Sequence, residues 1–175
     1  MPLSNDLREF VELLNSNGVE YLVVGGFAVF YHGFARYTGD IDFLVRANEA
    51  NSHRVLAALS QFGFGSAGIH AEDFQSPDRV VQLGVPPNRI DILTSISGVS
   101  FDGAWDSRTA GMLDGVATQF IGREALIRNK ESTGPGEGSG RCGRTPKASV
   151  GRERRAELSF RFIANLTSFD PATAP

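Results

Sequence analysis

The sequence predicts one α+β domain, in which a small, twisted, mixed sheet is backed by helices and carboxylates line one rim. Two hydrophobic patterns point to this class: some segments carry apolar residues at helical spacing, and others are short apolar or alternating runs bounded by glycine, proline and asparagine. A third observation is size, because 175 residues of which 41% are hydrophobic can bury a core without disulfides. The single cysteine, Cys142, excludes an intramolecular disulfide and a multi-cysteine zinc site.

Each expected element has a local signal. A capping residue, Ser4 or Asn5, precedes apolar residues at helical spacing, and Gly18 suits a left-handed helix end. Asn48 is the corresponding cap of a second long helix. Glycines and a Pro-Pro-Asn turn separate the runs that predict strands. In chain order we expect a helix from the Ser4–Asn5 cap to Gly18, a strand at 21–24, a short helix at 27–32, a strand at 40–45, a helix at 49–61, strands at 79–85, 89–94 and 116–120, and a helix at 123–130.

The net charge of −3 is unevenly spread along the chain. Residues 1–131 carry 10 Lys or Arg against 16 Asp or Glu, and residues 132–175 carry 7 against 4. An acidic body argues against broad DNA binding, which needs many phosphate contacts. The N-terminus lacks the basic and apolar blocks of a signal peptide, and no apolar run approaches the ~18 residues of a membrane span. We therefore expect a cytoplasmic protein without a membrane partner.

The composition changes abruptly near residue 132. From Ser132 to Ser149 there is no Val, Ile, Leu, Met, Phe, Trp or Tyr, whereas five of the eighteen residues are glycine and two are proline. Such a stretch cannot build a packed core. The sequence therefore predicts a folded domain at 1–133 and a Gly/Pro/Arg-rich, disordered tail at 134–175.

The most informative residues are three aspartates in predicted strands. Asp40 and Asp42 lie two apart, so a strand projects both to one face while Ile41 faces the core. Asp91 alternates with isoleucines in a later strand. Neighbouring carboxylates repel unless a cation lies between them, and hard oxygen ligands suit Mg²⁺. Three of them on neighbouring strands can hold two metal ions, one beside the attacking oxygen and one beside the leaving phosphates.

A glycine pair precedes this aspartate pair. Gly25-Gly26 follows the predicted strand at 21–24, where backbone N–H groups could approach a triphosphate closely. Each part alone is commonplace, because an Asp-x-Asp at a strand edge is often only solvated and Gly-Gly is usually a turn. The coincidence of the glycine pair, the aspartate pair and a later strand-borne aspartate is far more specific.

This combination resembles the nucleotidyltransferase superfamily of the DNA polymerase β type, above all its minimal branch of antitoxin-type nucleotidyltransferases and AbiEii-like toxin proteins. Arg36-Tyr-Thr38-Gly-Asp40-Ile-Asp42 matches an Arg-x-Thr-x-Asp-x-Asp motif common in that branch, and the resemblance covers about residues 5–133. It implies a nucleotidyltransferase-type domain with two Mg²⁺ or Mn²⁺ ions. It implies that Asp40, Asp42 and Asp91 are the metal ligands, that Asp91 is also the candidate general base, and that Gly25 and Gly26 cradle the triphosphate. Arg36 would contact phosphate or form a surface ion pair, and Thr38 would orient the aspartate loop. Lys130 would neutralise donor phosphate or be only a solvated helix end.

The resemblance implies transfer of a nucleoside monophosphate from an NTP to an acceptor hydroxyl with release of pyrophosphate, in a toxin–antitoxin setting. The alternative is a catalytically inactive module of the same fold that binds a toxin or antitoxin partner. A small-molecule-modifying enzyme shares the chemistry but usually carries an extra helical domain. The acceptor, whether a tRNA end, a protein side chain or a small molecule, is not readable from the sequence.

The segment after Lys130 departs from the family pattern. In the resembling proteins this helix runs on into a Gly-Arg-x-Lys-Asp-Leu-Ala-Asp-Val segment, whereas here Thr133 is followed by a glycine-rich stretch. Codons for residues 134–147 can be chosen so that a one-base shift reads Gly-Arg-Gly-Lys-Asp-Leu-Ala-Asp-Val-Asp-Ala-Leu-Arg-Lys. We therefore hypothesise a frameshift near Gly134, which the nucleotide sequence of the gene tests directly.

Overall fold

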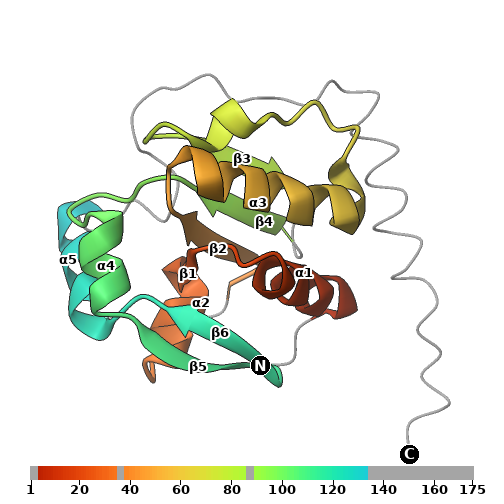
Figure 1. The fold of residues 1–175 in the computed structure, drawn as a ribbon. Helices are drawn as coiled ribbons and strands as arrows, with labels where there is room; N and C mark the ends of the chain where they lie inside the picture. Colours follow the sequence, from red (N-terminus) through yellow and green to blue (C-terminus); the bar gives the residue numbers. More distant parts are fainter. Residues whose placement is uncertain (1–3, 35–37, 86–88, 134–175) are drawn as a thin grey trace, which may run out of the picture.

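A six-stranded mixed sheet with helices on both faces forms the body of the protein (Figure 1). The computed structural model describes residues 4–34, 38–85 and 89–133. The strand order is β3-β4-β2-β1-β6-β5, which confirms the predicted α+β class with a mixed sheet. The elements are α1 (Asn5–Ser16), β1 (Tyr21–Val24), α2 (Gly25–Tyr31), β2 (Asp40–Val45), α3 (Glu49–Leu59), the π-helical turn η1 (Ser60–Phe64), the 3₁₀ turn η2 (Ala71–Phe74), β3 (Val80–Leu83), β4 (Arg89–Leu93), α4 (Phe101–Asp106), β5 (Thr109–Leu113), β6 (Val116–Phe120) and α5 (Arg123–Thr133).

Strand directions bring the ends of β2 and β4 together. These two strands are parallel neighbours, as are β1 and β6, whereas β1–β2, β3–β4 and β5–β6 are antiparallel. A parallel pair needs a crossover connection, which α3 and the segments after it supply between β2 and β4. The N-terminal halves of β2 and β4 therefore lie side by side, although about fifty residues separate them in the chain.

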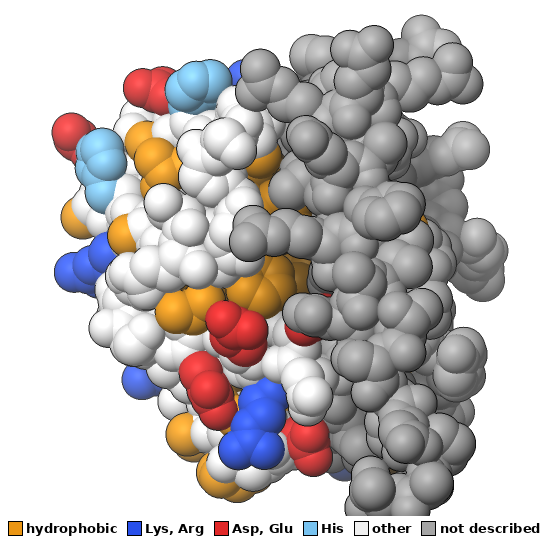
Figure 2. All heavy atoms as spheres, turned by 90° about the vertical axis from the view of Figure 1, so that its right-hand side faces the viewer, with side chains coloured by type: hydrophobic (Ala, Val, Ile, Leu, Met, Phe, Trp, Pro, Cys, Tyr) orange, Lys and Arg blue, Asp and Glu red, His pale blue; other side chains and the backbone are white. Residues whose placement is uncertain are grey.

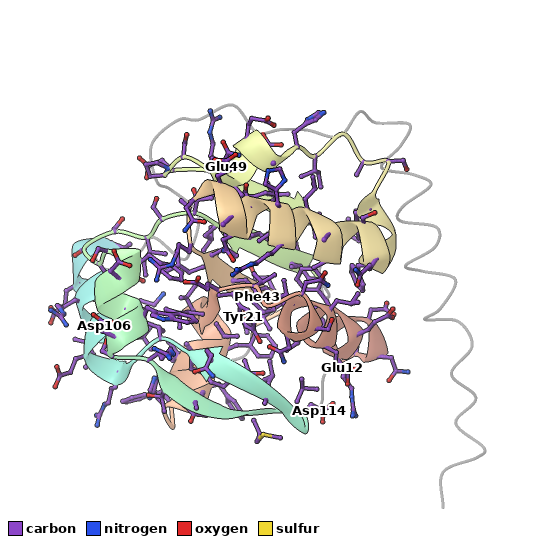
Figure 3. All side chains as sticks on the ribbon, in the orientation of Figure 1. Glu12, Tyr21, Phe43, Glu49, Asp106 and Asp114 are labelled. Carbon is purple, nitrogen blue, oxygen red and sulfur yellow. The ribbon has the colours of Figure 1, made fainter. Side chains whose placement is uncertain are left out.

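The sheet separates two cores, and strand alternation decides which residues enter each. In β2, Ile41, Phe43 and Val45 pack into the larger core with α1 and α3. Tyr21 and Phe43 point into this space, where their rings meet edge to face at 5.6 Å (Figure 3). Leu44 faces the other way, into a smaller core with α2, α4 and α5. Because Asp40 and Asp42 alternate with Ile41 and Phe43, they lie on this second face.

The sequence did not predict strand β5, helix α4 or the 3₁₀ turn η2, and helix α3 ends earlier than expected. Strand β5 contains Gly111, where a Cβ atom would lie only 2.6 Å from the ring of Tyr31, so this glycine reflects packing rather than a strand propensity. Helix α4 is six residues long, too short to show a clear periodicity. Helix α3 ends at Leu59 and passes into η1, where Gly63 has a φ of 101°. The expected turn at 86–88 and the tail at 134–175 lie outside the described residues.

Charges of both signs are mixed on the surface. On the face shown in Figure 2, acidic side chains lie next to basic ones and below apolar ones. Exposed side chains such as Arg8 and Glu12 form an ion pair one helical turn apart. Within the described ranges, none of the helices has the length and apolar character needed to cross a bilayer.

Replacing Asn51 with alanine is expected to lower the free energy of unfolding by about 2–3 kcal/mol. The Asn51 side chain is 1% exposed, accepts a hydrogen bond from the Glu20 N–H at 2.8 Å, and donates to the carbonyl oxygens of Glu20 and Arg46 at 3.1 Å. Its loss leaves these backbone groups without that partner. Urea unfolding measures the effect. Asn48→Ala, which removes only the α3 cap bond, should cost about 1 kcal/mol, and an equal cost for both changes would contradict this role.

Candidate active site

The three predicted aspartates lie together on the second face of the sheet. The parallel register pairs Asp42 with Asp91 and Asp40 with Arg89, so all four side chains project from adjacent positions of β2 and β4. Asp42 is 2% exposed and Asp91 is 4% exposed, whereas the side chain of Asp40 is about one quarter exposed. Carboxylates this deeply buried are rare unless they are paired with cations or coordinate metal.

The glycine pair makes room for this cluster. Gly25 has a φ of 62°, and a Cβ atom there would lie 1.9 Å from Oδ2 of Asp42. At Gly26, a Cβ atom would lie 2.7–2.9 Å from the side chain of Thr38. From the sequence we expected Gly25 and Gly26 to let a triphosphate approach the backbone. The structure gives a different reason for glycine at both positions, because a side chain there would collide with Asp42 and with Thr38.

Thr38 contacts Asp40 directly. Its Oγ1 lies 2.5 Å from Oδ1 of Asp40 and 3.1 Å from the Asp40 carbonyl oxygen. A hydroxyl hydrogen bond to a carboxylate restricts the rotation of the carboxylate, so Thr38 fixes the orientation of Asp40. Arg36, the remaining candidate of this loop, lies outside the described residues.

Arg89 belongs to the cluster, although the sequence analysis did not select it. Its Nη2 lies 2.5 Å from Oδ2 of Asp40 and 2.9 Å from Oδ2 of Asp91, so one guanidinium nitrogen bridges both carboxylates. Gln82 of β3 is a further neighbour, with Nε2 3.5 Å from Oδ2 of Asp91. The signal for Arg89 was its place two residues before Asp91, on the same face of the strand.

The electrostatics of the site favour the binding of a cation. Burial, followed by the charges of Asp91 and Asp40, raises the pKa of Asp42 to about 7, against the opposing effects of Lys130 and Arg89. Burial also raises the pKa of Asp91, while Arg89 lowers it. Among the described residues, Oδ2 of Asp42 and Oδ1 of Asp91 are buried without a hydrogen-bond partner. A cation bound to these oxygens would relieve both the repulsion and the missing interactions.

Comparison with known proteins bears on the fold. No family model matches the sequence, and no curated protein matches it at a significant level. The structure resembles the crystal structure of a "putative nucleotidyltransferase" from Thermotoga maritima, with a TM-score of 0.53, 16% sequence identity and 91% of each chain covered. The chain has a nucleotidyltransferase-type fold. At this identity the likeness shows the fold alone.

Helix α5 of this nucleotidyltransferase-type fold brings Lys130 towards the aspartates. The charge of Lys130 acts on Asp42, whose pKa it lowers. Two contacts pack α5 against residues 97 and 98. Asn129 donates to the carbonyl oxygen of Ser97 at 2.9 Å, and Gly98, with a φ of 74°, leaves room for Ser132. A Cβ atom at Gly98 would lie 2.0 Å from Oγ of Ser132. The sequence placed Lys130 at a helix end, and in the structure the charge of this residue acts on Asp42.

The side chains fit a divalent cation by chemistry, with Arg89 as a competitor. Buried carboxylate oxygens without partners, on two adjacent strands, are the hard ligands that Mg²⁺ and Mn²⁺ prefer. In the part of the chain that the structure describes, however, no three His, Cys, Asp or Glu side chains form a ready-made metal site. Instead, Arg89 bridges Asp40 and Asp91. Asp40, Asp42 and Asp91 are the side chains that would hold such an ion.

Proposed function

We propose that this chain is a metal-dependent nucleotidyltransferase, which moves a nucleoside monophosphate from an NTP to an acceptor hydroxyl and releases pyrophosphate. One observation carries the proposal: Asp42 and Asp91 are paired across adjacent parallel strands, each with a buried carboxylate oxygen that has no partner among the residues that the structure describes. Structural ion pairs satisfy their carboxylates, whereas these oxygens are left for a ligand that binds during function. The nucleotidyltransferase-type fold supports the same reading.

The proposed reaction divides the work among the chain's own side chains. The acceptor oxygen attacks the α-phosphorus, the bond from that phosphorus to the bridging oxygen of the β-phosphate breaks, and pyrophosphate leaves. Asp40, Asp42 and Asp91 would hold two divalent cations, which would neutralise charge on the triphosphate and on the attacking oxygen. Asp91 orients the acceptor hydroxyl and accepts its proton. Lys130 adds positive charge beside Asp42, where donor phosphates would lie.

The substrates and partners remain proposals on the same footing. The donor is an NTP with Mg²⁺ or Mn²⁺, and the acceptor is a tRNA end, a protein side chain or a small molecule. A toxin–antitoxin partner protein follows from the family resemblance. We do not propose broad DNA binding, because residues 1–131 carry 16 acidic against 10 basic side chains.

A second candidate function is a non-catalytic interaction module with the same fold. The ion pairs of Arg89 with Asp40 and Asp91 favour it, because they compensate part of the acidic cluster without any metal. In such a module the aspartates would be structural. Binding of NTP would then be absent or independent of divalent cations.

Calorimetric titration of each NTP into the protein is expected to show binding with Mg²⁺ and none with EDTA. Asp40→Ala should weaken the Mg²⁺-dependent binding at least tenfold, because it removes one of the proposed ligands. Asp106→Ala is the matched control, since Asp106 is exposed at the end of α4 and should leave binding unchanged. Binding that survives EDTA, or that Asp40→Ala leaves intact, would favour the interaction module.

A further inference from the structure

Arg89 contacts two of the three carboxylates that are proposed as metal ligands. Its Nη2 contacts Oδ2 of Asp40 and Oδ2 of Asp91, the outer and inner carboxylates of the cluster. The register that pairs Arg89 with Asp40 places the guanidinium between two carboxylates on different strands. A Mg²⁺ or Mn²⁺ ion that binds Oδ2 of Asp40 or of Asp91 at about 2 Å would compete with the guanidinium nitrogen for that oxygen.

The net charge of the cluster makes the guanidinium and the divalent cations compete. The three ionised aspartates and Arg89 carry a formal net charge of −2, which two divalent cations would reverse to +2. The guanidinium is attracted to the cluster in the first state and repelled in the second. Arginine stays charged at all relevant pH values, so it can leave only by movement of the side chain.

The guanidinium is also incompletely satisfied where it lies. Nε of Arg89 is buried without a hydrogen-bond partner among the described residues, while about a quarter of the side chain is exposed. A buried N–H without an acceptor is unfavourable relative to water. Rotation outward would hydrate Nε, so the structure holds Arg89 in place by its two ion pairs rather than by a complete set of bonds.

We propose that Arg89 is a placeholder cation, which offsets part of the negative charge of the aspartates in the metal-free protein and is displaced when a divalent cation binds. The inference rests on the proposed function in one respect, namely that Asp40, Asp42 and Asp91 bind divalent cations. It adds that Arg89 lowers the affinity for the metal while stabilising the metal-free fold. In the opposite role, Arg89 would orient the carboxylates as ligands, and its removal would weaken metal binding.

Titration with Mn²⁺ alone, followed by calorimetry or by the electron paramagnetic resonance signal of free Mn²⁺, separates these roles. Arg89→Gln is expected to bind Mn²⁺ at least tenfold more tightly than the wild type. Arg79→Gln makes the same change of net charge at an exposed residue just before β3 and should bind like the wild type. Arg89→Lys keeps the charge on a smaller headgroup, so its affinity for Mn²⁺ should lie between those of the wild type and Arg89→Gln.

Thermal unfolding gives a second readout that does not depend on activity. With EDTA, Arg89→Gln should have a lower Tm than the wild type, because Asp40 and Asp91 lose the cation that bridges them. Mn²⁺ should raise the Tm of Arg89→Gln more than that of the wild type. If Arg89→Gln folds only with Mn²⁺, this dependence is itself the expected coupling.

The outcomes distinguish the two proposals. Equal or weaker Mn²⁺ binding by Arg89→Gln, with clear binding by the wild type, overturns the placeholder role and leaves the nucleotidyltransferase proposal standing. Mn²⁺ binding that appears only in Arg89→Gln supports the placeholder role. Absence of binding in every variant overturns both proposals.

Discussion

Asp42→Asn is expected to make the metal-free protein more stable at pH 8 and to abolish its metal-dependent NTP binding. Asp42 is buried beside two further carboxylates, and these surroundings raise its pKa to about 7. Above that pH the folded protein holds a charge that the unfolded chain carries at lower cost. Asparagine keeps the shape, removes the charge and offers an N–H to neighbouring acceptors. The same change removes a proposed metal ligand.

The pH dependence has a defined sign. Between the ordinary value of 3.8 and the folded pKa of about 7, the folded state binds more protons at Asp42 than the unfolded state does. The contribution of Asp42 to stability therefore falls as pH rises through this window, by on the order of 2–4 kcal/mol, and is constant above it. Asp42→Asn should flatten this part of the profile.

The measurement is the Tm of both proteins with EDTA at pH 5.5 and pH 8. A gain of about 5 °C or more is expected for Asp42→Asn at pH 8, and a smaller gain at pH 5.5. Calorimetric titration with NTP and Mg²⁺ tests the expected loss of metal-dependent NTP binding. A less stable variant at pH 8 would show that the carboxylate has a partner in the metal-free protein, and retained partner-protein binding without any NTP effect would favour the interaction module.

Gly25→Ala is expected to destabilise the fold by about 3–5 kcal/mol and to displace the carboxylate of Asp42. The added Cβ would lie 1.9 Å from Oδ2 and 2.7 Å from Cγ of Asp42, far inside van der Waals contact. The φ of 62° adds a strain that only glycine avoids. Because β1 and β2 are paired at this point, neither strand can retreat without loss of sheet hydrogen bonds.

Gly18→Ala is the matched control for this change. Gly18 has nearly the same φ, 63°, but no atom of the described residues lies within 4 Å of a Cβ added there. It should therefore cost only the backbone strain, about 1 kcal/mol. Urea unfolding of both variants separates the strain from the clash. Similar costs for the two changes would show that Asp42 moves aside freely.

A double variant shows where the clash lies, even if Gly25→Ala alone fails to fold. In an Asp42→Ala background the two closest atoms, Oδ2 and Cγ, are gone, and Cβ of residue 42 is 3.2 Å away. Gly25→Ala should then cost about as much as Gly18→Ala. The difference between the two backgrounds measures the coupling of Gly25 to Asp42. A cost that is unchanged in this background would place the clash elsewhere.

Local pattern accounts for most of the strands and for the choice of aspartates. Apolar residues on either side of Asp40, Asp42 and Asp91 predicted that each would leave its strand on one face, and the structure places all three on one face. The same reasoning missed β5, because Gly111 lies in its centre and packs against Tyr31, a residue 80 positions earlier. Contacts of this kind leave no periodic trace in the sequence.

The contacts within the site depended on register. Sequence spacing placed Gly25 and Gly26 near a possible phosphate, but only the pairing of β1 with β2 shows that Gly25 lies against Asp42. Arg89 could be placed on the face of Asp91, but its bridge to Asp40 needed the parallel alignment of β2 with β4. Lys130 was placed at a helix end, and its distance to the cluster depended on how α5 packs.

The sequence by itself determined the class of the fold, most of its elements and the three acidic side chains, because strand alternation and helix periodicity are properties of near neighbours in the chain. Only the tertiary structure shows that Arg89 lies among those carboxylates, and only it shows what Gly25 and Gly26 leave room for. Both depend on side chains that approach from other strands and helices. The distances between such side chains are set by strand register and packing, which act between residues far apart in the sequence.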